Sequence, residues 1–223
     1  MANLIAPTFR SGIINDNNYR ALAQIIKTKY YFMEKEINRC GWVGANPLMQ
    51  EYHDHEWGVP VHDDQKWFEF LTLDAFQAGL SWTTIINKRK NFEKAFDNFN
   101  AKKIAVYNET KIDELMQDAG IIRNKMKILA TIHNAKEFMK IQKEFGSFDK
   151  YIWQFTKGKT IVNKWTSIKE VPASSAVSDE MSKDLKKRGF KFVGSTICYA
   201  FMQAAGMVND HLVDCFRYKE VLK

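Results

Sequence analysis

The chain of 223 residues has few cysteines, few prolines and no long apolar run. Its three cysteines are an odd number without a close spacing pattern, which argues against a disulfide framework and for thiols that are free to bind metal. No apolar stretch reaches the roughly eighteen residues that a membrane span needs, and the opening residues lack the charged and apolar regions of a signal peptide. We therefore expect a cytoplasmic protein with no membrane association.

Acidic residues are also fewer than basic ones, 26 Asp and Glu against 33 Lys and Arg, so the formal net charge is +7. This excess favours an anionic partner, although it is also compatible with an ordinary solvated surface. The basic residues are densest in one segment, which contains Lys183, Lys186, Lys187, Arg188 and Lys191. Their clustering favours the anionic partner.

Strand-like alternation of apolar and polar residues is absent as well, and the chain shows helical spacing throughout. With 45% hydrophobic residues, a chain of this length can bury a substantial core. The segments predicted to be helical are Gln65–Ala78, Asn108–Asp118, Asn124–Ile141, Ser147–Thr156, Asp179–Lys187 and Gly194–Ala205. Together they predict an all-α fold, a helical bundle of about eight helices or more.

The first residues stand apart from this bundle. We expect residues 1–37 to form an N-terminal extension with a helical piece over Tyr19–Glu36, and residues 38–223 to form the functional domain. Met33 stands just before that domain. The upstream residues are therefore either a true extension or the product of a misassigned start.

Four candidate metal ligands form two pairs near opposite ends of the expected domain. Cys40 and His53 have twelve residues between them, and His211 and Cys215 have three. Thiolates and imidazoles suit a borderline-soft ion such as Zn²⁺, and four such ligands leave no coordination position for water or substrate. Chance placement on one helical face also explains the second pair, and His55 competes with His53. The spacing is thus compatible with a structural zinc ion that joins the N- and C-terminal segments.

A turn bounded by glycines interrupts the basic segment. In Leu185–Thr196 a cationic helix ends, a short turn follows, and a new helix begins that Ser195 or Thr196 can cap. This pattern indicates a helix-hairpin-helix, in which backbone amides bind one phosphate without reading bases. The candidate DNA-binding residues are Lys187, Arg188, Gly189, Lys191, Gly194 and Ser195. A simple corner between two helices with a solvated basic rim is the alternative.

A second candidate site combines a carboxylate with aromatic residues. Leu73–Trp82 places Asp74 in an otherwise apolar helical stretch, where a carboxylate is costly to bury without a partner or a task. Tyr52, Trp42 and Trp57 lie close in sequence to the candidate metal ligands. Such residues are commonly part of a core, but stacking on a nucleobase also requires an aromatic cluster. From this segment alone, an Asp74 that faces solvent is an equally good explanation.

Several segments, in this order, resemble the 3-methyladenine DNA glycosylase I family. They are RCGWV (Arg39–Val43), YHDHEWGVP (Tyr52–Pro60), QAGLSW (Gln77–Trp82), DAGIIRNKMKI (Asp118–Ile128), LKKRGFKFVGSTICY (Leu185–Tyr199) and NDHLVDC (Asn209–Cys215). The resemblance extends from about Arg39 to Tyr218 and implies a helix-hairpin-helix DNA glycosylase fold with one structural zinc ion. The family's ligand positions match Cys40, His53, His211 and Cys215. His55 falls at a position that is not a ligand.

The resemblance also assigns a pocket for the damaged base. The family's base-recognition tyrosine matches Tyr52 and its stacking tryptophan matches Trp82, while Gly79 and Leu80 match the turn that enters DNA. Two further aromatic residues fall close to this pocket, Trp42 and Trp57. One position departs, because the usual pocket glutamate is Asp74 here. The side chain of Asp74 is one methylene shorter than that of glutamate. Three consequences are open: a water molecule bridges the carboxylate and the base, the helix lies closer to the base, or the base preference differs.

The activity implied by the resemblance is hydrolysis of the N-glycosidic bond of 3-methyladenine. A monofunctional enzyme of this kind flips the nucleotide out of alkylated double-stranded DNA and leaves an abasic site, with Asp74 as its catalytic residue. Two other classes compete: a non-catalytic DNA-binding or damage-sensing module, and a zinc-dependent hydrolase, which needs an open coordination position. We expect a monomer that uses zinc structurally and binds DNA containing an alkylated purine.

Overall fold

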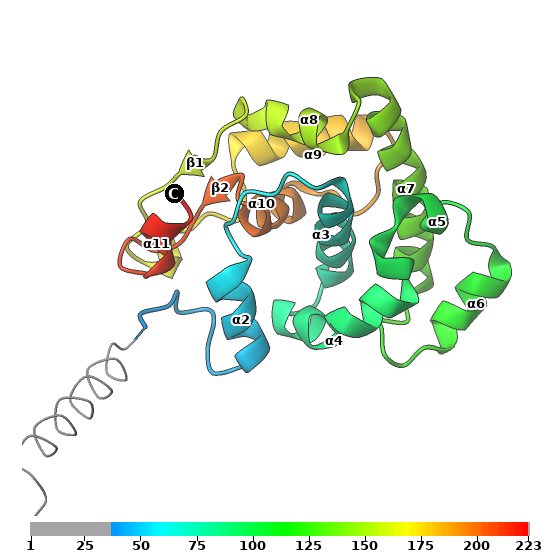
Figure 1. Cartoon of the computed structure of the whole chain (residues 1–223), viewed down its shortest axis with the longest axis horizontal. Helices are drawn as coiled ribbons and strands as arrows, with labels where there is room; N and C mark the ends of the chain where they lie inside the picture. Colours follow the sequence, from blue (N-terminus) through cyan, green and yellow to red (C-terminus); the bar gives the residue numbers. More distant parts are fainter. Residues whose placement is uncertain (1–36, 223) are drawn as a thin grey trace, which may run out of the picture. The chain divides into compact units, whose positions relative to one another are not determined.

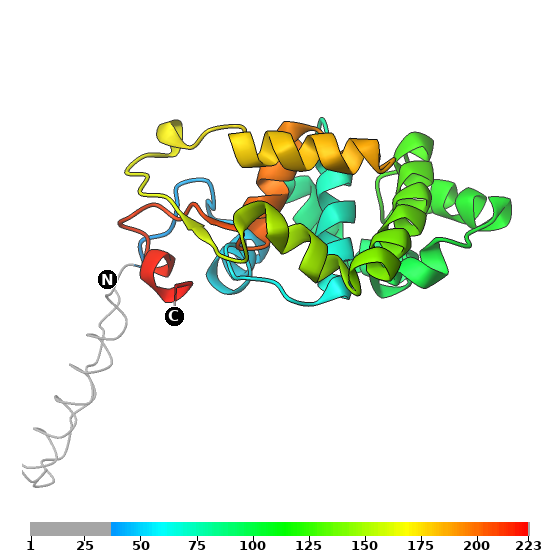
Figure 2. The same cartoon turned by 90° about the horizontal axis from the view of Figure 1, so that it is seen from above.

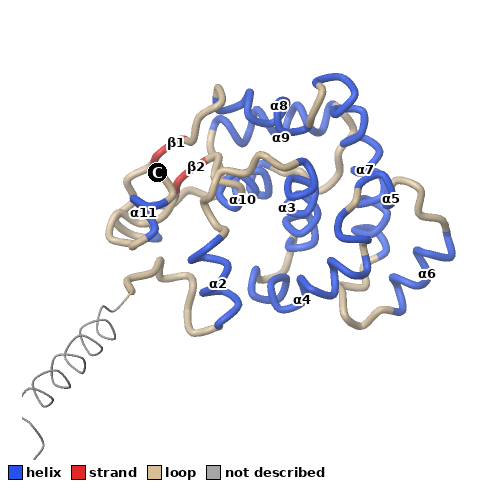
Figure 3. Tube along the Cα trace, in the orientation of Figure 1, coloured by secondary structure: helices blue, strands red, loops and turns tan. Residues whose placement is uncertain are grey.

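The computed structural model describes residues 37–222, most of which are helical (Figures 1 and 3). The α-helices are α2 (Pro47–His55), α3 (Asp64–Gln77), α4 (Trp82–Ala95), α5 (Ala101–Ile104), α6 (Glu109–Gln117), α7 (Lys125–Phe145), α8 (Phe148–Ile152), α9 (Ala176–Lys187), α10 (Ser195–Ala204) and α11 (Arg217–Glu220). The 3₁₀ helices are η1 (Asp97–Phe99), η2 (Trp153–Thr156) and η3 (Ile168–Glu170). No helix within this part of the chain is long and apolar enough to cross a membrane.

The predicted helical class is confirmed, and each of the predicted segments overlaps a helix. They correspond to α3, α6, α7, α8 with η2, α9 and α10. Sequence analysis did not single out α2 or α4, because each has a mostly polar surface and only three buried residues. The expected helix at Tyr19–Glu36 lies outside the described residues.

Two short strands are an exception to the all-α prediction, which is wrong on this point. β1 (Ile161–Val162) pairs in parallel with β2 (Val208–Asn209) (Figure 3). Strands of two residues are too short to show an alternating pattern in the sequence. Their pairing has a structural consequence, because β2 precedes His211 and holds the segment that carries this candidate ligand.

Helix α3 lies at the centre of the unit formed by the residues from Asn38 onward. Asp63 caps its N-terminus by accepting from Lys66 N at 2.8 Å, and nine of its fourteen residues are buried. It packs against α4, α7, α8 and α10, and Figure 1 shows it surrounded by these helices. Because α3 is enclosed on several sides, its polar residue Asp74 is buried along with its apolar neighbours.

The two ends of this unit lie side by side. Phe216 N donates to Asn38 O at 3.0 Å, and Asn38 Nδ2 donates to Asp214 O at the same distance. The segment before α2 therefore runs next to the segment that leads into α11, as Figures 1 and 2 show. This topology brings together the two sequence regions that carry the candidate metal ligands.

The turn after α10 packs tightly against the segment that follows α2, and this contact generates a stability prediction. Gly206 has φ +70°, and a Cβ there would lie 2.4 Å from Pro60 N and Val59 C. We expect Gly206→Ala to lower the free energy of unfolding by about 2 kcal/mol or more, from strain and overpacking. Denaturant titration measures the loss.

Gly158 provides the matched control for this substitution. Its φ is +71°, but nothing lies within 4 Å of a Cβ built on it. Gly158→Ala should therefore cost about 1 kcal/mol, from backbone strain alone. If both variants lose the same free energy of unfolding, the close backbone approach at Gly206 does not contribute to the cost of the substitution.

Candidate functional site

The four predicted metal ligands meet in one buried cluster. Ligand atoms of Cys40, His53, His211 and Cys215 all lie within 4.8 Å of one another. Each of the four residues is at most 4% exposed. The competing His55 is a surface residue whose Nε2 lies 3.7 Å from Glu51 Oε2. The chain thus contains a buried Cys₂His₂ cluster that can hold a metal ion.

The distances within the cluster fit a tetrahedral ion. Cys215 Sγ lies 3.5 Å from His53 Nε2 and 3.6 Å from His211 Nδ1, and Cys40 Sγ lies 3.7 Å from His211 Nδ1. A tetrahedron with zinc–sulfur bonds of about 2.3 Å and zinc–nitrogen bonds of about 2.0 Å has sulfur–nitrogen edges of about 3.5 Å. The donor set and its dimensions therefore both suit zinc.

The outward-facing nitrogen of each histidine also has a partner. His53 Nδ1 lies 2.8 Å from Asp54 Oδ1, and Arg39 NH2 donates to Asp54 Oδ2 at 2.6 Å. Burial raises the pKa of Asp54, but hydrogen bonds from Arg39 and His53 outweigh it and hold the pKa below its usual value. His211 Nε2 lies 3.0 Å from Trp57 O. Contacts of this kind fix the orientation of metal-binding imidazole rings.

A pocket of about 430 Å³ lies next to this cluster. Its walls include the predicted base-binding residues Tyr52, Trp42, Trp57 and Trp82, and the predicted catalytic residue Asp74. The wall residues that sequence analysis missed include Met49, Gln77, Ile168, Pro172, Ala200 and Gln203. They come from α2, α3, η3 with the loop after it, and α10, so no local sequence signal connects them.

The aromatic rings form one continuous wall of the pocket. The centroids of Tyr52 and Trp82 are 5.3 Å apart, and those of Trp42 and Trp57 are 4.9 Å apart. A base held between two rings would need about 7 Å, twice the usual carbon–carbon contact distance. The space between Tyr52 and Trp82 is therefore too narrow for a planar ligand, whereas an exposed face of the wall offers a stacking surface.

Two buried polar atoms of the pocket have no hydrogen-bond partner among the described residues, Asp74 Oδ2 and Trp82 Nε1. Asp74 is only 3% exposed, so the alternative of a solvent-facing carboxylate is wrong. An unpartnered buried polar group costs free energy and calls for an explanation. A ligand that donates to the carboxylate and accepts from the indole would satisfy both atoms.

Burial also sets the charge state of the pocket. It raises the pKa of Asp74 well above the usual value. Burial, and then the charge of Asp74, raise the pKa of Tyr52 well above its usual value. The empty pocket therefore disfavours a negative charge on Asp74, and a cationic ligand would compensate for that charge.

An ion network ties together the helices that carry the pocket residues. Arg89 on α4 donates to Glu56 at the end of α2 and to Glu69 on α3, each at 2.7 Å. Burial raises the pKa of Glu56, but hydrogen bonds and charge from Arg89 and Lys66 outweigh it and lower the pKa to about 2. The network therefore holds α2, α3 and α4 in a fixed arrangement around the pocket.

The turn between α3 and α4 lies at the edge of this site. Gly79 has φ +77°, a conformation that glycine adopts without strain, and Leu80 is 40% exposed. Ser81 then caps α4 by accepting from Thr84 N. The structure thus presents an apolar side chain between the helix of Asp74 and the helix that begins with Trp82.

A second turn, between α9 and α10, contains the predicted hairpin. Gly189 has φ +100°, and Gly194 is the N-cap of α10. The prediction that Ser195 or Thr196 caps this helix is wrong, because both lie within it and the Ser195 hydroxyl contacts Asp179 and Ser178. No side chain among the described residues caps the first turn of α10. Its amides are therefore available to an anion.

The basic side chains around this turn differ in their surroundings. Lys191 is held by its backbone, with its N–H donating to Asn134 Oδ1 at 2.8 Å. Arg188 donates to Asp184 and Glu144, each at 2.8 Å, and lies over aromatic rings. These two carboxylates offset the positive charge of Arg188. Its guanidinium group is therefore already paired within the protein.

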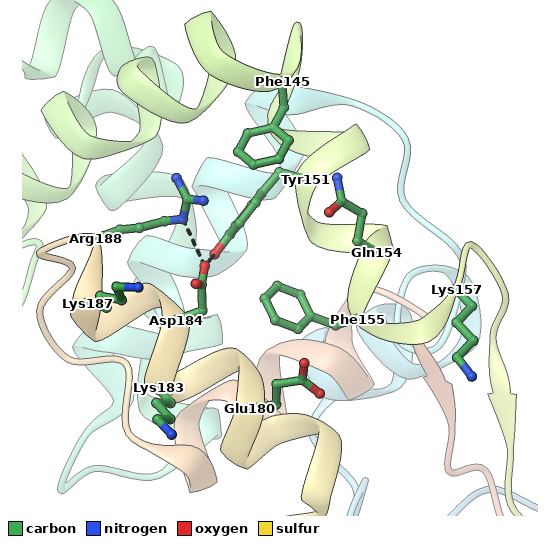
Figure 4. A pocket seen from close by; sticks show the side chains of 10 residues that line it. All are labelled: Phe145, Tyr151, Gln154, Phe155, Lys157, Glu180, Lys183, Asp184, Lys187 and Arg188. Atoms are coloured by element: carbon green, nitrogen blue, oxygen red, sulfur yellow. Dashed lines mark hydrogen bonds and ion pairs between the residues drawn. The ribbon is translucent and has the colours of Figure 1, made fainter.

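Arg188 and Lys187 also line a second cavity, of about 550 Å³ (Figure 4). Its walls come from the end of α7, from α8 with η2, and from α9. Figure 4 shows the aromatic side chains of this cavity, Phe145, Tyr151 and Phe155, on α7, α8 and η2, and the lysines Lys183 and Lys187 on α9. The predicted base-binding residues are not among those that line it, and sequence analysis did not anticipate this cavity.

Comparisons with known proteins agree on one family. Residues 42–218 match the family model described as methyladenine glycosylase. The chain is 48% identical over 182 residues to DNA-3-methyladenine glycosylase 1 of Escherichia coli, covering 82% of this chain and 97% of that protein. It is 47% identical over 177 residues to the DNA-3-methyladenine glycosylase of Haemophilus influenzae, covering 79% and 96%.

Solved structures show the same similarity in three dimensions. A crystal structure of 3-methyladenine DNA glycosylase I matches with a TM-score of 0.78 at 46% identity, covering 80% of this chain and 98% of that chain. The enzyme from Staphylococcus aureus, solved to show how 3-methyladenine is recognised, matches with a TM-score of 0.78 at 35% identity, covering 81% and 96%.

The raised pKa of Asp74 predicts how this residue affects stability. The folded protein keeps the Asp74 proton at pH values where the unfolded chain has lost it, so the folded state loses stability as pH rises above about 4. Asparagine has no such proton to lose. We expect Asp74→Asn to raise the Tm of the free protein by about 2–4 °C at pH 7. The gain should shrink toward pH 4.

Asp184 is the matched control, because its pKa is shifted in the opposite direction from that of Asp74. Burial raises its pKa, but hydrogen bonds from Tyr151 and Arg188 lower it below the usual value. Asp184→Asn should therefore lower the Tm at pH 7. Thermal unfolding at both pH values gives the comparison, and a lower Tm for Asp74→Asn at pH 7 would contradict the effect of burial.

Proposed function

The chain belongs to the methyladenine glycosylase family, and from that premise we propose how its residues act. It is a DNA-3-methyladenine glycosylase, a repair enzyme that hydrolyses the N-glycosidic bond of 3-methyladenine in alkylated DNA and leaves an abasic site. The proposal for the individual residues rests chiefly on one observation. Asp74 Oδ2 and Trp82 Nε1 are buried in an aromatic pocket beside the Cys₂His₂ cluster, and neither has a hydrogen-bond partner within residues 37–222.

Base recognition is assigned to the aromatic wall and to Asp74. The flipped base stacks on Trp82, which contributes about 1–3 kcal/mol, and Tyr52 contacts it from the neighbouring position. Trp42 packs against the ring of Tyr52, and Trp57 packs against Trp42. Asp74 accepts a hydrogen bond from the base, either directly or through one water molecule, because it is shorter than the glutamate usual in the family.

Charge gives this pocket its selectivity for the lesion. Methylation at N3 makes adenine cationic while it is still attached to deoxyribose. In the low-dielectric pocket an ionised Asp74 is costly alone but is compensated by that cation. Unmodified adenine is neutral and supplies no such compensation. The burial of Asp74 therefore favours the methylated base over the normal one.

The same charge activates the leaving group. The C1′–N9 bond breaks with its electron pair moving to the base, which leaves as neutral 3-methyladenine. Water adds to C1′ and releases a proton. A hydrogen bond from the base to Asp74 that persists through this step stabilises the transition state. None of the described residues that line the pocket is a lysine, in keeping with hydrolysis without strand cleavage.

DNA is held at two glycine turns, one at the edge of the pocket and one between α9 and α10. Leu80 enters the duplex where the damaged nucleotide has left the stack. The turn between α9 and α10 acts as a helix-hairpin-helix, with the open amides that begin at Ser195 directed to a phosphate. Gly189 and Gly194 shape this turn, while Lys187 and Lys191 add positive charge. Arg188 contributes to the same basic surface, although its charge is shared with Asp184 and Glu144.

The Cys₂His₂ cluster holds one structural zinc ion in this proposal. Four protein ligands complete a tetrahedron and leave no position for substrate, so the ion takes no part in hydrolysis. Its effect on the pocket is positional. Tyr52 is adjacent to the ligand His53, and Trp57 O contacts the ligand His211. A bound ion would therefore fix two residues of the aromatic wall.

The working unit is proposed to be a cytoplasmic monomer in which residues 38–223 carry the activity. The match to the family model falls within these residues, and both the pocket and the cluster are built from them. Residues 1–37 then form an extension that is not needed for base release.

Removal of the Asp74 charge tests the proposed chemistry. We expect Asp74→Asn to lower single-turnover release of 3-methyladenine from methylated DNA by about a hundredfold or more. DNA binding should persist, because Asp74 lies in the pocket and not on the DNA surface. Liquid chromatography of the released base and a gel-shift titration on the same DNA measure the two quantities.

Asp74→Glu is the matched variant, because it restores the usual family residue and keeps the charge. It should retain release within about tenfold of the native rate. For the native protein, kcat/KM should fall as pH decreases through the raised pKa of Asp74, whereas Asp74→Asn should lack this step. An unchanged release rate in Asp74→Asn would remove Asp74 from the mechanism. Binding of methylated DNA without base release by the native protein would identify a damage sensor.

Cysteine substitutions test the metal. We expect the purified protein to contain about one zinc ion per chain, and Cys40→Ala and Cys215→Ala to lose it. Each should lower the free energy of unfolding by about 3 kcal/mol or more. Cys198→Ala is the control, because Cys198 is also buried but lies outside the cluster. Elemental analysis that finds no zinc in the native protein, or equal zinc in all the variants, would refute the assignment.

A further inference from the structure

Lys127 is a buried lysine that the proposed chemistry does not use. It lies in the first turn of α7 and is 7% exposed. Its Nζ donates to Phe76 O at 2.8 Å and to Ala78 O at 2.6 Å, across 51 and 49 residues of sequence. Burial lowers the pKa of Lys127 below its usual value. A lysine is placed in such surroundings at a cost, so its contacts call for a function.

The two acceptors of Lys127 complete the C-terminal end of α3. The last carbonyls of a helix have no partner within the helix, and they attract positive charge. Here Ala75 O accepts from Ala78 N at 3.4 Å, and Gln77 O accepts from Leu80 N at 2.7 Å. Lys127 supplies donors to two further carbonyls, those of Phe76 and Ala78. The end of α3 is thereby attached to α7.

The attached segment leads directly into the turn that carries Leu80. Ala78 is the C-cap of α3, Gly79 follows with φ +77°, and Leu80 is exposed to solvent. Apart from Gly79 itself and its two chain neighbours, no atom in the described part of the chain lies within 4 Å of a Cβ built on Gly79, so side-chain packing does not confine the turn at that point. Its conformation therefore depends on backbone hydrogen bonds, including the two from Lys127.

We propose that Lys127 is a positioning residue that holds the Ala78–Leu80 turn in the conformation in which Leu80 replaces the flipped nucleotide. This inference rests on the proposed function. An apolar side chain enters a duplex against the resistance of base stacking. A turn that yields under this resistance would flip the nucleotide poorly, although the pocket could still bind a base.

Lys127→Met tests this role, because methionine keeps the apolar stem and removes the ammonium donor. Single-turnover release is measured from a fully paired duplex and from the same duplex with the lesion inside a mismatched bubble, where flipping is easier. We expect a loss of about 10- to 100-fold on the paired duplex and of at most about threefold in the bubble. Affinity for free 3-methyladenine, followed by tryptophan fluorescence, should be unchanged.

Lys88→Met is the matched control. Lys88 Nζ also donates to two carbonyls of a glycine turn, Ala119 O at 2.9 Å and Gly120 O at 3.2 Å, outside the residues that line the pocket. This variant should release base from both duplexes at the native rate. Equal losses of Lys127→Met on both duplexes, or weaker binding of the free base, would show that Lys127 supports only the fold and would overturn the proposal.

Lys127→Gln is the second variant, for the case in which the methionine variant does not fold. It keeps one hydrogen-bond donor, so we expect a smaller loss that is still confined to the paired duplex. Release from the paired duplex at the native rate by a folded Lys127→Gln would overturn the proposal. If the native protein releases no base from either duplex, the proposed function fails, and the role of Lys127 fails with it.

Discussion

The enclosure of α3 is the constraint on which the rest of the site depends. Neighbouring helices cover this helix on several sides, so Asp74 is desolvated although it is a carboxylate. Desolvation makes a negative charge unfavourable unless a positive charge accompanies it. The lesion base carries such a charge while it is attached to DNA. In the proposed function, selectivity and weakened stability therefore have the same origin, a carboxyl group kept away from water.

The walls around Asp74 are fixed from two directions. On one side, Arg89 joins α2, α3 and α4 through Glu56 and Glu69. On the other side, the Cys₂His₂ cluster brings together the two ends of the domain. It meets the aromatic wall at Tyr52, which precedes His53 in the sequence, and at Trp57, whose carbonyl oxygen contacts His211. Rigid support of this kind is what a recognition site for a planar base requires. In the proposed function, the cluster therefore acts through position and not through reactivity.

The helices and the four residues of the Cys₂His₂ cluster could be predicted from the sequence, and much of the site's detail could not. Long apolar helices such as α3 and α7 carry a clear periodic signal, whereas α2 and α4 bury only three residues each. The burial of Asp74 depends on helices distant in sequence. The segment alone therefore did not show whether the Asp74 side chain faces the core or the solvent. Gln203 and Lys127 carry no local signal, because their contacts lie across long sequence separations. The capping prediction at Ser195 failed because Gly194 takes the cap position.

The central claim is that burial keeps the Asp74 carboxyl neutral until the base compensates for its charge. It is tested most directly by ¹³C NMR titration of that carboxyl carbon, assigned by comparison with Asp74→Asn. In the free protein we predict a midpoint well above the ordinary value of about 4, and a lower midpoint when the protein binds DNA that carries the cationic lesion nucleotide in a form that resists hydrolysis. A carboxyl that titrates near pH 4 in both states would contradict the claim.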